Sequence, residues 1–321
     1  MPGMLAPLLS PVILFFVLGA AAGFARSDLT IPEQIAKGLS LYLMAAIGLK
    51  GGIEVAEAGF SIDMLLAALA GLALSCLLPL PVFWMLRRFG RLDRINAAAV
   101  SAHYGSVSVV TFVAGVEVLS SSGLPPQGYM VAVLALMETP AIVVGLLLAR
   151  SGSRETATAT AGAGLLHETL LNGSVVLLAG SFLIGLVIGP DGFASIAPVF
   201  ESGFRGVLCL FLLDMGLVAA RRLRGSRTLT ARLAGLAILM PVLNGTLGAL
   251  LGTAVGLDVG TVAILATLAA SASYIAVPAA MRLALPEADP GLYLAMSLAV
   301  TFPFNITLGI PLYTLMATGL G

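Results

Sequence analysis

The sequence contains very little charge. Of its 321 residues, 16 are Lys or Arg and 16 are Asp or Glu, so 10% of the chain is charged and the net charge is zero. Soluble domains usually have about 25% charged residues. Here 59% of the residues are hydrophobic and the mean hydropathy is +1.06. This composition excludes an ordinary soluble domain and predicts an integral membrane protein. The arginines adjoin apolar segments and form no patch suited to nucleic acid.

Reactive side chains and enzyme motifs are also scarce. The chain has two cysteines and two histidines. Cys76 and Cys209 lie in apolar segments, where we expect small buried side chains rather than a disulfide or a metal pair. The sequence contains no H-E-x-x-H zinc motif, no G-x-S-G serine protease motif and no Walker A lysine loop. We therefore expect neither an enzyme nor an ATP-driven pump, and we expect no cofactor.

What the chain has instead is long apolar segments. A helix needs about 20 apolar residues to cross roughly 30 Å of hydrocarbon, and lipid offers no partner to a backbone group outside a helix. We therefore predict an all-α membrane protein with ten transmembrane helices, the first of which is retained because it lacks a signal-peptide pattern. The predicted spans 1 to 10 are 7–25, 34–51, 62–86, 95–119, 128–149, 168–189, 200–220, 231–255, 258–284 and 291–318.

The second half of the chain repeats the first. A coarse repeat in such an apolar chain is typical of transporters built from two related halves. We predict a first repeat over 1–149, a flexible cytoplasmic linker over 150–164 and a second repeat over 165–321. Because each repeat has an odd number of spans, the second is expected to be inverted in the membrane. The matched residues are Leu92-Asp93 with Leu257-Asp258, Ser106 with Ser271, Ser108 with Ser273, Gly19 with Gly185, Gly48 with Gly216, and Glu138-Thr-Pro140 with Thr301-Phe-Pro303.

The basic residues predict the orientation. With ten spans, only Lys50 and Arg205 fall on one face of the membrane. Because cytoplasmic loops are enriched in Lys and Arg, the other face is expected to be cytoplasmic and both termini to lie outside. The basic residues predicted to be cytoplasmic are Arg26, Lys37, Arg87, Arg88, Arg91, Arg94, Arg150, Arg154, Arg221, Arg222, Arg224, Arg227, Arg232 and Arg282.

Short serine-rich segments fall near the middle of spans 4 and 9. These segments are Gly105-Ser106-Val107-Ser108 and Ala270-Ser271-Ala272-Ser273. Glycine and small hydroxyl residues permit an unwound turn, after which a new half-helix begins with free N–H groups and a partial positive charge. We predict that both helices are broken and that their ends bind a small anion, with the serine hydroxyls as further donors. Alternatively, these small residues only allow close helix packing.

A carboxylate deep in span 5 suggests a cation site. A buried charge in a membrane is costly and usually faces a cavity or a cation. Glu138 precedes Thr139-Pro140, and proline leaves a backbone carbonyl without its donor one turn earlier. We expect this set of oxygens to suit Na⁺, with Thr301 and Asn305 offering neutral oxygens in the second repeat. The alternative for Glu138 is a proton-linked role or a buried hydrogen bond that stabilises the protein.

For two further polar residues within the predicted spans, Asp214 and His103, the sequence leaves two interpretations open. Asp214 in span 7 either takes part in transport or pairs with Arg205 or Lys50. His103, beside the serine-rich segment, is either a proton relay or a structural hydrogen-bonding residue. Asn244 in span 8 is expected to form hydrogen bonds between helices.

Taken together, several motifs resemble a known family. The chain is similar to the sodium-dependent bicarbonate transporter family first known from cyanobacteria (SbtA-like permeases), and the similarity covers all ten spans in order. The motifs that carry the resemblance are I-G-L-K-G-G (47–52), G-S-V-S-V-V-T (105–111), M-E-T-P-A (137–141), S-A-S-Y-I-A-V-P-A-A-M-R (271–282) and G-I-P-L-Y (309–313).

This resemblance implies both architecture and partners. Spans 1, 2, 6 and 7 would form a gate or scaffold domain, and spans 3–5 and 8–10 a core that moves as an elevator within a homotrimer. Cyanobacterial members have a longer central loop and bind a small trimeric regulator of the PII type, a partner that the short linker here leaves open. The substrate site that the family implies comprises Gly105, Ser106, Ser108, Thr111, Ser271 and Ser273.

The chain departs from the cyanobacterial pattern at two positions. Tyr274 stands where that pattern has an acidic residue, and Val109 where it has a glycine. Loss of a carboxylate beside the site leaves the sodium stoichiometry and the identity of the anion open. Tyr274 could occupy the place of an ion or form a hydrogen bond to the anion.

These observations lead to one expected function. We expect a multi-pass carrier in the bacterial inner membrane that imports bicarbonate with Na⁺ by alternating access. Tyr274 joins the expected anion site, and Thr111 joins Glu138 in holding Na⁺. The alternatives are a carrier of another small monovalent anion, such as a short carboxylate, driven by Na⁺ or H⁺, and a membrane sensor that binds the anion without net flux.

Overall fold

The computed structural model describes residues 10–150, 173–226 and 228–321, and every regular element within them is a helix. In the predicted first repeat the helices are α2 (Pro11–Phe24), α3 (Glu33–Ala58), α4 (Ile62–Leu77), α5 (Pro79–Arg88), α6 (Arg94–Gly105), α7 (Val109–Ser121), α8 (Met130–Met137) and α9 (Pro140–Arg150). In the second they are α11 (Gly173–Phe193), η2 (Pro198–Ser202), α12 (Phe204–Gly225), α13 (Ala231–Ala254), α14 (Val259–Ala270), α15 (Ala276–Ala284), α16 (Pro290–Leu294), η3 (Ala295–Thr301), α17 (Phe302–Phe304), η4 (Asn305–Gly309) and α18 (Ile310–Leu320). The linker predicted over 150–164 lies, from residue 151 onward, outside the described residues.

Helices occupy all ten predicted apolar ranges. Among the described residues, seven helical segments are both long and apolar enough to cross a membrane, which makes the chain a multi-pass membrane protein. Two further apolar helices are shorter, because α2 has 14 residues and α14 has 12. The remaining range holds α12, which has 22 residues but ends in an arginine-rich turn. That all ten ranges cross the bilayer stays a prediction.

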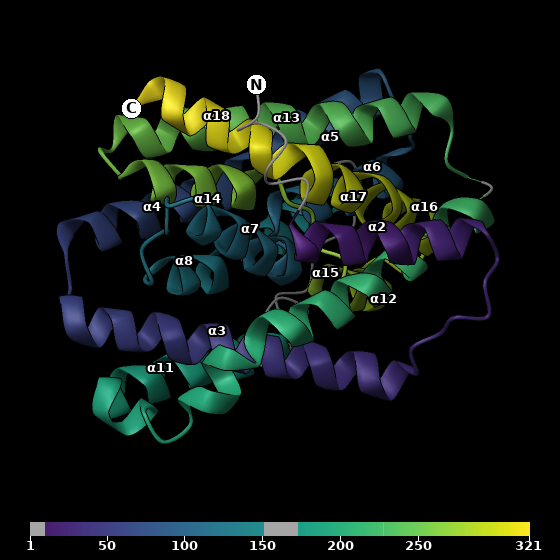
Figure 1. Ribbon diagram of the computed structural model, residues 1–321. Coiled ribbons are helices and arrows are strands. Elements are labelled where there is room, and N and C mark those ends of the chain that lie inside the picture. The colour runs from purple at the N-terminus through teal and green to yellow at the C-terminus, as the bar shows by residue number, and fades with distance from the viewer. Residues whose placement is uncertain (1–9, 151–172, 227) are drawn as a thin grey trace.

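Two helix pairs pack through glycine. In one pair α2 lies against α12, and in the other α3 lies against α11, side by side along one edge of the molecule (Figure 1). A Cβ atom on Gly19 of α2 would lie 2.0 Å from the Leu213 carbonyl oxygen of α12, and one on its matched residue Gly185 of α11 would lie 2.2 Å from that of Leu49 on α3. Only glycine permits such close approach of two backbones. Exchanging the repeats turns the α2–α12 contact into the α11–α3 contact, so the glycines matched in the sequence make equivalent contacts.

The matched Leu-Asp dipeptides cap matched helices. Asp93 precedes α6, and its carboxylate accepts hydrogen bonds from the Asn96 backbone N–H at 2.9 Å and the Asn96 side-chain amide at 2.6 Å. Asp258 precedes α14 and accepts from the Thr261 N–H at 3.0 Å and its hydroxyl at 2.6 Å. A carboxylate at this position satisfies a helix N–H group that has no intrahelical partner. The first half-helix of each repeat therefore begins in the same way.

The centre of the molecule is formed by the interrupted helices. Figure 1 shows α13, α14 and α18 together at the edge opposite α3 and α11, with α7 and α8 between them. The segment from Ala295 to Gly309 winds through two π-helical stretches on either side of α17. Such wide turns are uncommon and often occur at functional sites. Here they flank Pro303, the residue matched in the sequence with Pro140, which begins α9 at the α8–α9 junction.

Two expectations from the sequence are wrong. Cys209 is buried as expected, but Cys76 is exposed on α4, because it lies on the same helix face as the exposed Leu69 and Ala73. Arg205 does not pair with Asp214: its ion-pair partner is Glu117 on α7, at 2.5 Å. Since Arg205 and Asp214 are both on α12 and more than two turns apart, the helix holds them out of reach of one another.

Candidate functional site

Both predicted helix breaks are present. The α6 helix ends at Gly105 and α7 begins at Val109, while α14 ends at Ala270 and α15 begins at Ala276. At the first residue of each break the backbone is extended, with φ −85° and ψ 170° at Ser106 and φ −74° and ψ 162° at Ser271. Matched serines therefore leave the helix with nearly the same geometry.

The two breaks contact each other directly. The Ser108 backbone N–H donates a hydrogen bond to the Ser271 hydroxyl oxygen at 2.9 Å. The Ser273 N–H donates to the His103 carbonyl oxygen, also at 2.9 Å, and His103 Nδ1 lies 2.5 Å from the Ser273 carbonyl oxygen. All four residues are buried. The crossing point is thus held by hydrogen bonds between the repeats as well as by packing.

A small cavity lies where the breaks meet a third interruption. Its volume is about 10 Å³, which is close to the least space that holds one water molecule. The third interruption is the α8–α9 junction, which contributes a carboxylate. The residues that line the cavity are Ser108, Glu138, Ser273 and Tyr274, together with Val107, Val109 and Ile275. Two serines, a tyrosine and the carboxylate selected from the sequence therefore share one buried space.

Ser108 and Ser273 combine a capping role with a free donor. The Ser108 hydroxyl oxygen accepts a hydrogen bond from the Thr111 N–H at 3.2 Å, so it caps α7. At the start of α15, the Val277 N–H donates to the hydroxyl oxygen of Ser273, which lies in the break before the helix, at 3.5 Å. A hydroxyl that accepts at a cap still has its proton to donate. Each serine can therefore hold its half-helix in place and donate to an oxygen atom in the cavity.

Ser106 and Ser271 serve the breaks instead. The Ser106 hydroxyl donates to the Glu138 carbonyl oxygen at 2.9 Å. That of Ser271 donates to the Leu268 carbonyl oxygen at 2.8 Å while accepting from Ser108. Neither side chain lines the cavity. Gly105 lies behind it, where its backbone packs against Pro79 so closely that an added Cβ atom would approach the Pro79 ring to 2.4 Å.

The Glu138 carboxylate has no opposite charge beside it. Its side chain is 3% exposed. Within the described part of the chain it forms no salt bridge and no side-chain hydrogen bond. The backbone around it is satisfied, because the Ser75 hydroxyl donates to the Met137 carbonyl oxygen at 2.8 Å and Ser106 covers that of Glu138. A buried unpaired charge is costly, so this carboxylate requires a cation or a proton.

Thr301 and Asn305 are engaged in structural hydrogen bonds. Thr301 Oγ1 donates to the Ala237 carbonyl oxygen at 2.6 Å and lies 2.6 Å from the Tyr104 hydroxyl. Asn305 donates from Nδ2 to the Ala270 carbonyl oxygen at 2.9 Å and accepts from the Tyr313 hydroxyl. Each oxygen still has a lone pair that could face a cation, so a cation-binding role for Thr301 and Asn305 stays a prediction. Thr111, also expected at the cation, is buried in the first turn of α7 and does not line the cavity.

The ends of the first half-helices have caps that the sequence showed only in part. Asn244 on α13 donates to the Tyr104 carbonyl oxygen at 3.1 Å, next to the end of α6. Asn305 does the same for Ala270 at the end of α14. A helix C-terminus has carbonyls without intrahelical donors, and an amide is a suitable partner in a dry interior. Asn244 was expected to bond between helices, whereas Tyr104 and Tyr313 carry no motif that would identify them.

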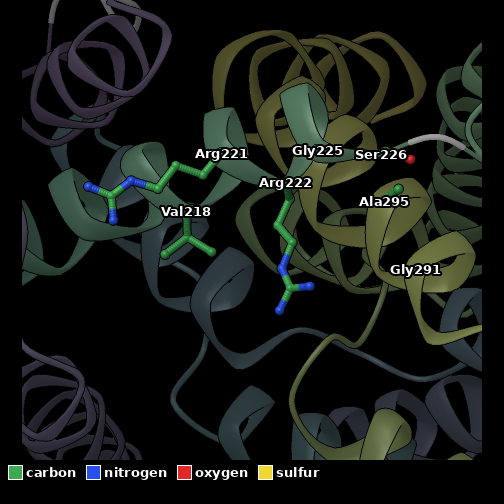
Figure 2. A pocket seen from close by; sticks show the side chains of 7 residues that line it. All are labelled: Val218, Arg221, Arg222, Gly225, Ser226, Gly291 and Ala295. Carbon is green, nitrogen blue, oxygen red and sulfur yellow. The ribbon is translucent and has the colours of Figure 1, made fainter. Parts of the chain in front are cut away.

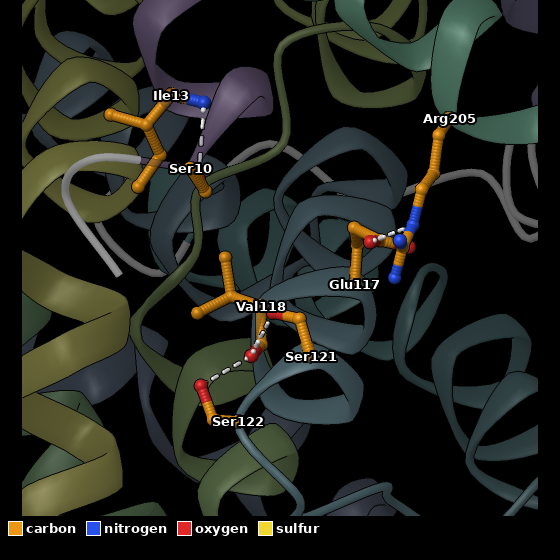
Figure 3. Close-up of polar contacts among 7 residues, drawn as sticks. All are labelled: Ser10, Ile13, Glu117, Val118, Ser121, Ser122 and Arg205. Carbon is orange, nitrogen blue, oxygen red and sulfur yellow. Dashed lines mark hydrogen bonds and ion pairs between the residues drawn. The ribbon is translucent and has the colours of Figure 1, made fainter. Parts of the chain in front are cut away.

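A larger cavity opens on the end of the molecule predicted to be outside. Its volume is about 610 Å³, and it lies between α3, α11, η2 and α12 on one side and α7 on the other. Figure 3 shows the Glu117–Arg205 ion pair that joins α7 to α12 within it. An adjoining cavity reaches Phe112, one turn along α7 from Ser108. These two cavities therefore approach the break from the C-terminal half of α7.

The opposite end of the molecule has a basic groove. The groove, about 360 Å³ in volume, lies between the C-terminal turns of α12 and the start of α16 and η3 (Figure 2). Figure 2 shows the side chains of Arg221 and Arg222 extending in different directions. Arg221 donates to the Leu29 carbonyl oxygen at 2.8 Å and Arg224 to that of Gly23 at 2.5 Å. The arginine-rich end of α12 and the segment around the end of α2, which the charge pattern assigns to one face of the membrane, therefore lie beside each other.

Comparison with known proteins identifies the family. Residues 11–318 match the model of the Na⁺-dependent bicarbonate transporter superfamily. Since the match covers nearly the whole chain, the protein belongs to this superfamily. The matched range includes the two serine-rich segments and M-E-T-P-A (137–141), which meet around the cavity. No match was found among curated proteins.

Proposed function

We propose that this member of the Na⁺-dependent bicarbonate transporter superfamily imports bicarbonate together with Na⁺ by an elevator movement. Helices α2, α3, α11 and α12 would form the scaffold, and the remaining helices the moving core. The single observation that carries the proposal is the buried cavity in which two serine-capped half-helices face the Glu138 carboxylate. Membership of this superfamily points to bicarbonate and Na⁺ as the two transported ions, and such a cavity suits both.

The anion would bind at the serine-capped helix ends. Helix geometry leaves the N–H groups of Val109 and Val110 with no carbonyl one turn earlier, and the start of α7 carries a partial positive charge. The hydroxyls of Ser108 and Ser273 would donate from two sides. A planar anion with three oxygens can accept all of these hydrogen bonds at once, whereas a long amphipathic molecule has no room.

The cation would be the counter-ion of Glu138. Among the described residues no three His, Cys, Asp or Glu side chains form a group that could hold a metal ion. A site for Na⁺ would therefore combine one carboxylate with neutral oxygens, as hard monovalent cations allow. Each ion then lowers the cost of holding the other in a low dielectric. This mutual dependence is the physical basis that we propose for coupling.

The cavity sizes suggest the state of the cycle. At about 10 Å³ the central cavity has no room for bicarbonate, while the outer cavity of about 610 Å³ reaches the neighbourhood of the site. We interpret this arrangement as a closed site below an outward vestibule. Loading would then require the two breaks to separate slightly, and release would require the core to move past the scaffold.

The assembly and placement in the membrane belong to the same proposal. At one end of α12, Arg221 binds a carbonyl of the loop after α2 and Arg224 binds one in the last turn of α2, so these predicted cytoplasmic charges gather at one end. This supports a bacterial inner-membrane protein with both termini outside the cytoplasm. The homotrimer follows from the family resemblance, and binding of a PII-type regulator stays open.

Uptake by purified protein in liposomes tests the function. Labelled bicarbonate should accumulate when Na⁺ is present outside, and much less when it is replaced by K⁺ or choline. The double variant Ser108→Ala/Ser273→Ala should take up far less anion, because each lost donor costs about 1–3 kcal/mol when a buried oxygen is left unpaired.

A matched variant makes this test specific. Ser101 is a buried serine on α6 whose hydroxyl donates to Ala98 of its own helix, at 2.8 Å. Ser101→Ala should therefore retain uptake. Uptake that ignores Na⁺ would contradict coupling, and uptake of a short carboxylate in preference to bicarbonate would reassign the cargo. Saturable binding without flux would indicate a sensor.

A further inference from the structure

His103 is buried next to the cavity, yet it does not line it. It lies in the last turn of α6, is fully buried and stacks on the Tyr293 ring with a centroid separation of 4.6 Å. Its two contacts with Ser273 run in both directions: its carbonyl oxygen accepts from the Ser273 N–H, and its Nδ1 faces the Ser273 carbonyl oxygen. One residue of the first repeat therefore holds both backbone polar groups of one residue in the second break.

The geometry determines which ring nitrogen carries the proton. A carbonyl oxygen can only accept, so the nitrogen at 2.5 Å from it must be a donor. Among the described residues Nε2 has no hydrogen-bond partner. A neutral ring therefore has its proton on Nδ1, and Ser273 rather than a neighbour of Nε2 fixes that state.

The second break needs this support more than the first. Five residues, Ser271 to Ile275, separate α14 from α15, whereas three separate α6 from α7. The cap before α7 is Ser108, which accepts from the Thr111 N–H at 3.2 Å, whereas Ile275 before α15 provides no side-chain hydrogen bond and the Ser273 hydroxyl accepts from the Val277 N–H only at 3.5 Å. The repeat mate of His103 is Leu268, which cannot form an equivalent bond. The asymmetry between the repeats thus places a histidine where the longer break would otherwise be held by few contacts.

We propose that His103 is a positioning residue for the anion half-site of the second repeat. By donating from Nδ1 to the Ser273 carbonyl, it holds the backbone so that the Ser273 hydroxyl and the first turn of α15 face the cavity. This inference rests on the proposed function for its transport readout, but the protonation of the ring can be measured without transport.

Two substitutions separate hydrogen bonding from packing. His103→Asn keeps a donor close to the position of Nδ1, while His103→Phe keeps the ring that stacks on Tyr293 and removes the donor. We expect His103→Phe to raise the KM for bicarbonate about tenfold, the effect of about 1.4 kcal/mol, with a smaller change in kcat and in half-saturation by Na⁺. His103→Asn should return KM to within about threefold of the parent. An unchanged KM in His103→Phe, or equal defects in both variants, would overturn the proposal.

The second measurement is the protonation of His103 in the unaltered site. The chain has two histidines, so a His167→Gln variant with ¹⁵N-labelled histidine gives one set of ring nitrogen signals. We expect the proton on Nδ1, and a proton on Nε2 in the neutral ring would overturn the proposal even if both position 103 variants fail to fold. Absence of bicarbonate uptake by the parent protein would instead refute the proposed function and leave the assignment of the tautomer intact.

Discussion

The two interrupted helices begin alike and are completed differently. Asp93 and Asp258 cap their first halves in the same way, and Ser106 and Ser271 leave them with nearly the same backbone angles. Beyond that point the first break is short and closed by its own serine cap. The second is longer, its own serine cap from Ser273 to the Val277 N–H measures 3.5 Å, and it is also held by His103 from the other half of the chain.

This difference shows where two structurally similar halves of one chain can specialise. The glycine contacts and the aspartate caps are determined by backbone geometry, so both copies need them. The polar groups inside the breaks line one common cavity. A polar or charged side chain from one half can therefore serve the cavity where the other half has none. The first repeat supplies a carboxylate at Glu138, where the second has Thr301, whose hydroxyl is already bonded to Ala237 and Tyr104.

The largest expected effect concerns this carboxylate. If Glu138 provides the counter-charge for Na⁺, Glu138→Gln should abolish the stimulation of uptake by Na⁺. Coupling between two ligand sites usually amounts to about 1–3 kcal/mol, a factor of about 5–150, and the variant should lose that whole factor. Uptake measured against external Na⁺ concentration gives the answer.

Two control variants sharpen the contrast between the repeats. Glu57→Gln removes an exposed carboxylate of the outer cavity and should leave the Na⁺ dependence unchanged. Thr301→Val should lower thermal stability while the protein that remains folded keeps its Na⁺ dependence. If Thr301→Val removes coupling as Glu138→Gln does, the cation is shared equally by both repeats and the proposed asymmetry is wrong.

The next effect concerns the amides at the ends of the first half-helices. Asn244 and Asn305 each donate to one such carbonyl, and Asn305 also accepts from Tyr313. An unpaired buried carbonyl costs about 1–3 kcal/mol, so Asn244→Ala and Asn305→Ala should both lower the unfolding temperature. Asn305→Ala should have the larger effect, since it leaves the Tyr313 hydroxyl unpaired as well. Equal losses in detergent melting curves would contradict this ranking.

Tyrosine hydroxyls offer a comparison between binding and stability. The Tyr274 hydroxyl is buried, has no hydrogen-bond partner among the described residues, and belongs to a side chain that lines the cavity together with Ser108. That of Tyr104 is bonded to Thr301 at 2.6 Å. Tyr274→Phe should therefore raise the KM for bicarbonate roughly tenfold, as for one lost donor, without loss of stability. Tyr104→Phe should do the reverse, and a stability loss in Tyr274→Phe would show that its hydroxyl is structural.

Local features of this fold could be predicted from the sequence, whereas side-chain directions could not. Breaks at Ser106 and Ser271 follow from small residues next to glycine or alanine, and such preferences act within a few residues. Which serine faces the cavity depends on neighbours far along the chain. Ser106 turns toward the Glu138 carbonyl only because the α8–α9 junction lies beside it.

The same limit explains the cation residues. Thr301 and Asn305 offer suitable oxygens, yet in the folded protein Thr301 Oγ1 donates to the Ala237 carbonyl, and Asn305 accepts from Tyr313 with Oδ1 while donating to Ala270 with Nδ2. The role of His103 could be stated only as two alternatives, because its partner Ser273 lies in the other repeat. Composition therefore predicts the class of ligand more securely than the atoms that contact it.

A smaller effect concerns the aspartate cap of α6. Burial raises the pKa of Asp93, but the hydrogen bonds from Asn96 outweigh it, so the pKa lies below its usual value. The cap therefore stabilises the protein above the unfolded pKa of about 3.9, and this stabilisation is lost as the pH falls through the lower folded value. Asp93→Ala should cost about 0.5–2 kcal/mol at pH 7, and its melting temperature should approach that of the parent near about pH 3. A difference that persists in acid would show that charge is not involved.

The smallest expected effect concerns the ion pair between the proposed core and scaffold. Glu117 lies on α7 and Arg205 on α12 (Figure 3), and the arginine side chain is 67% exposed. Because exposed pairs contribute about 0–1 kcal/mol and are screened by salt, Glu117→Gln should change the uptake rate less than about fivefold. The change should shrink further at high ionic strength. The core must break this contact to move, so the variant should be faster if separation limits the rate. A slower variant whose loss of rate is not reduced by salt would instead place Glu117 on the path of the ions. The contrast between a polar interior site and a passive outer contact would then no longer hold.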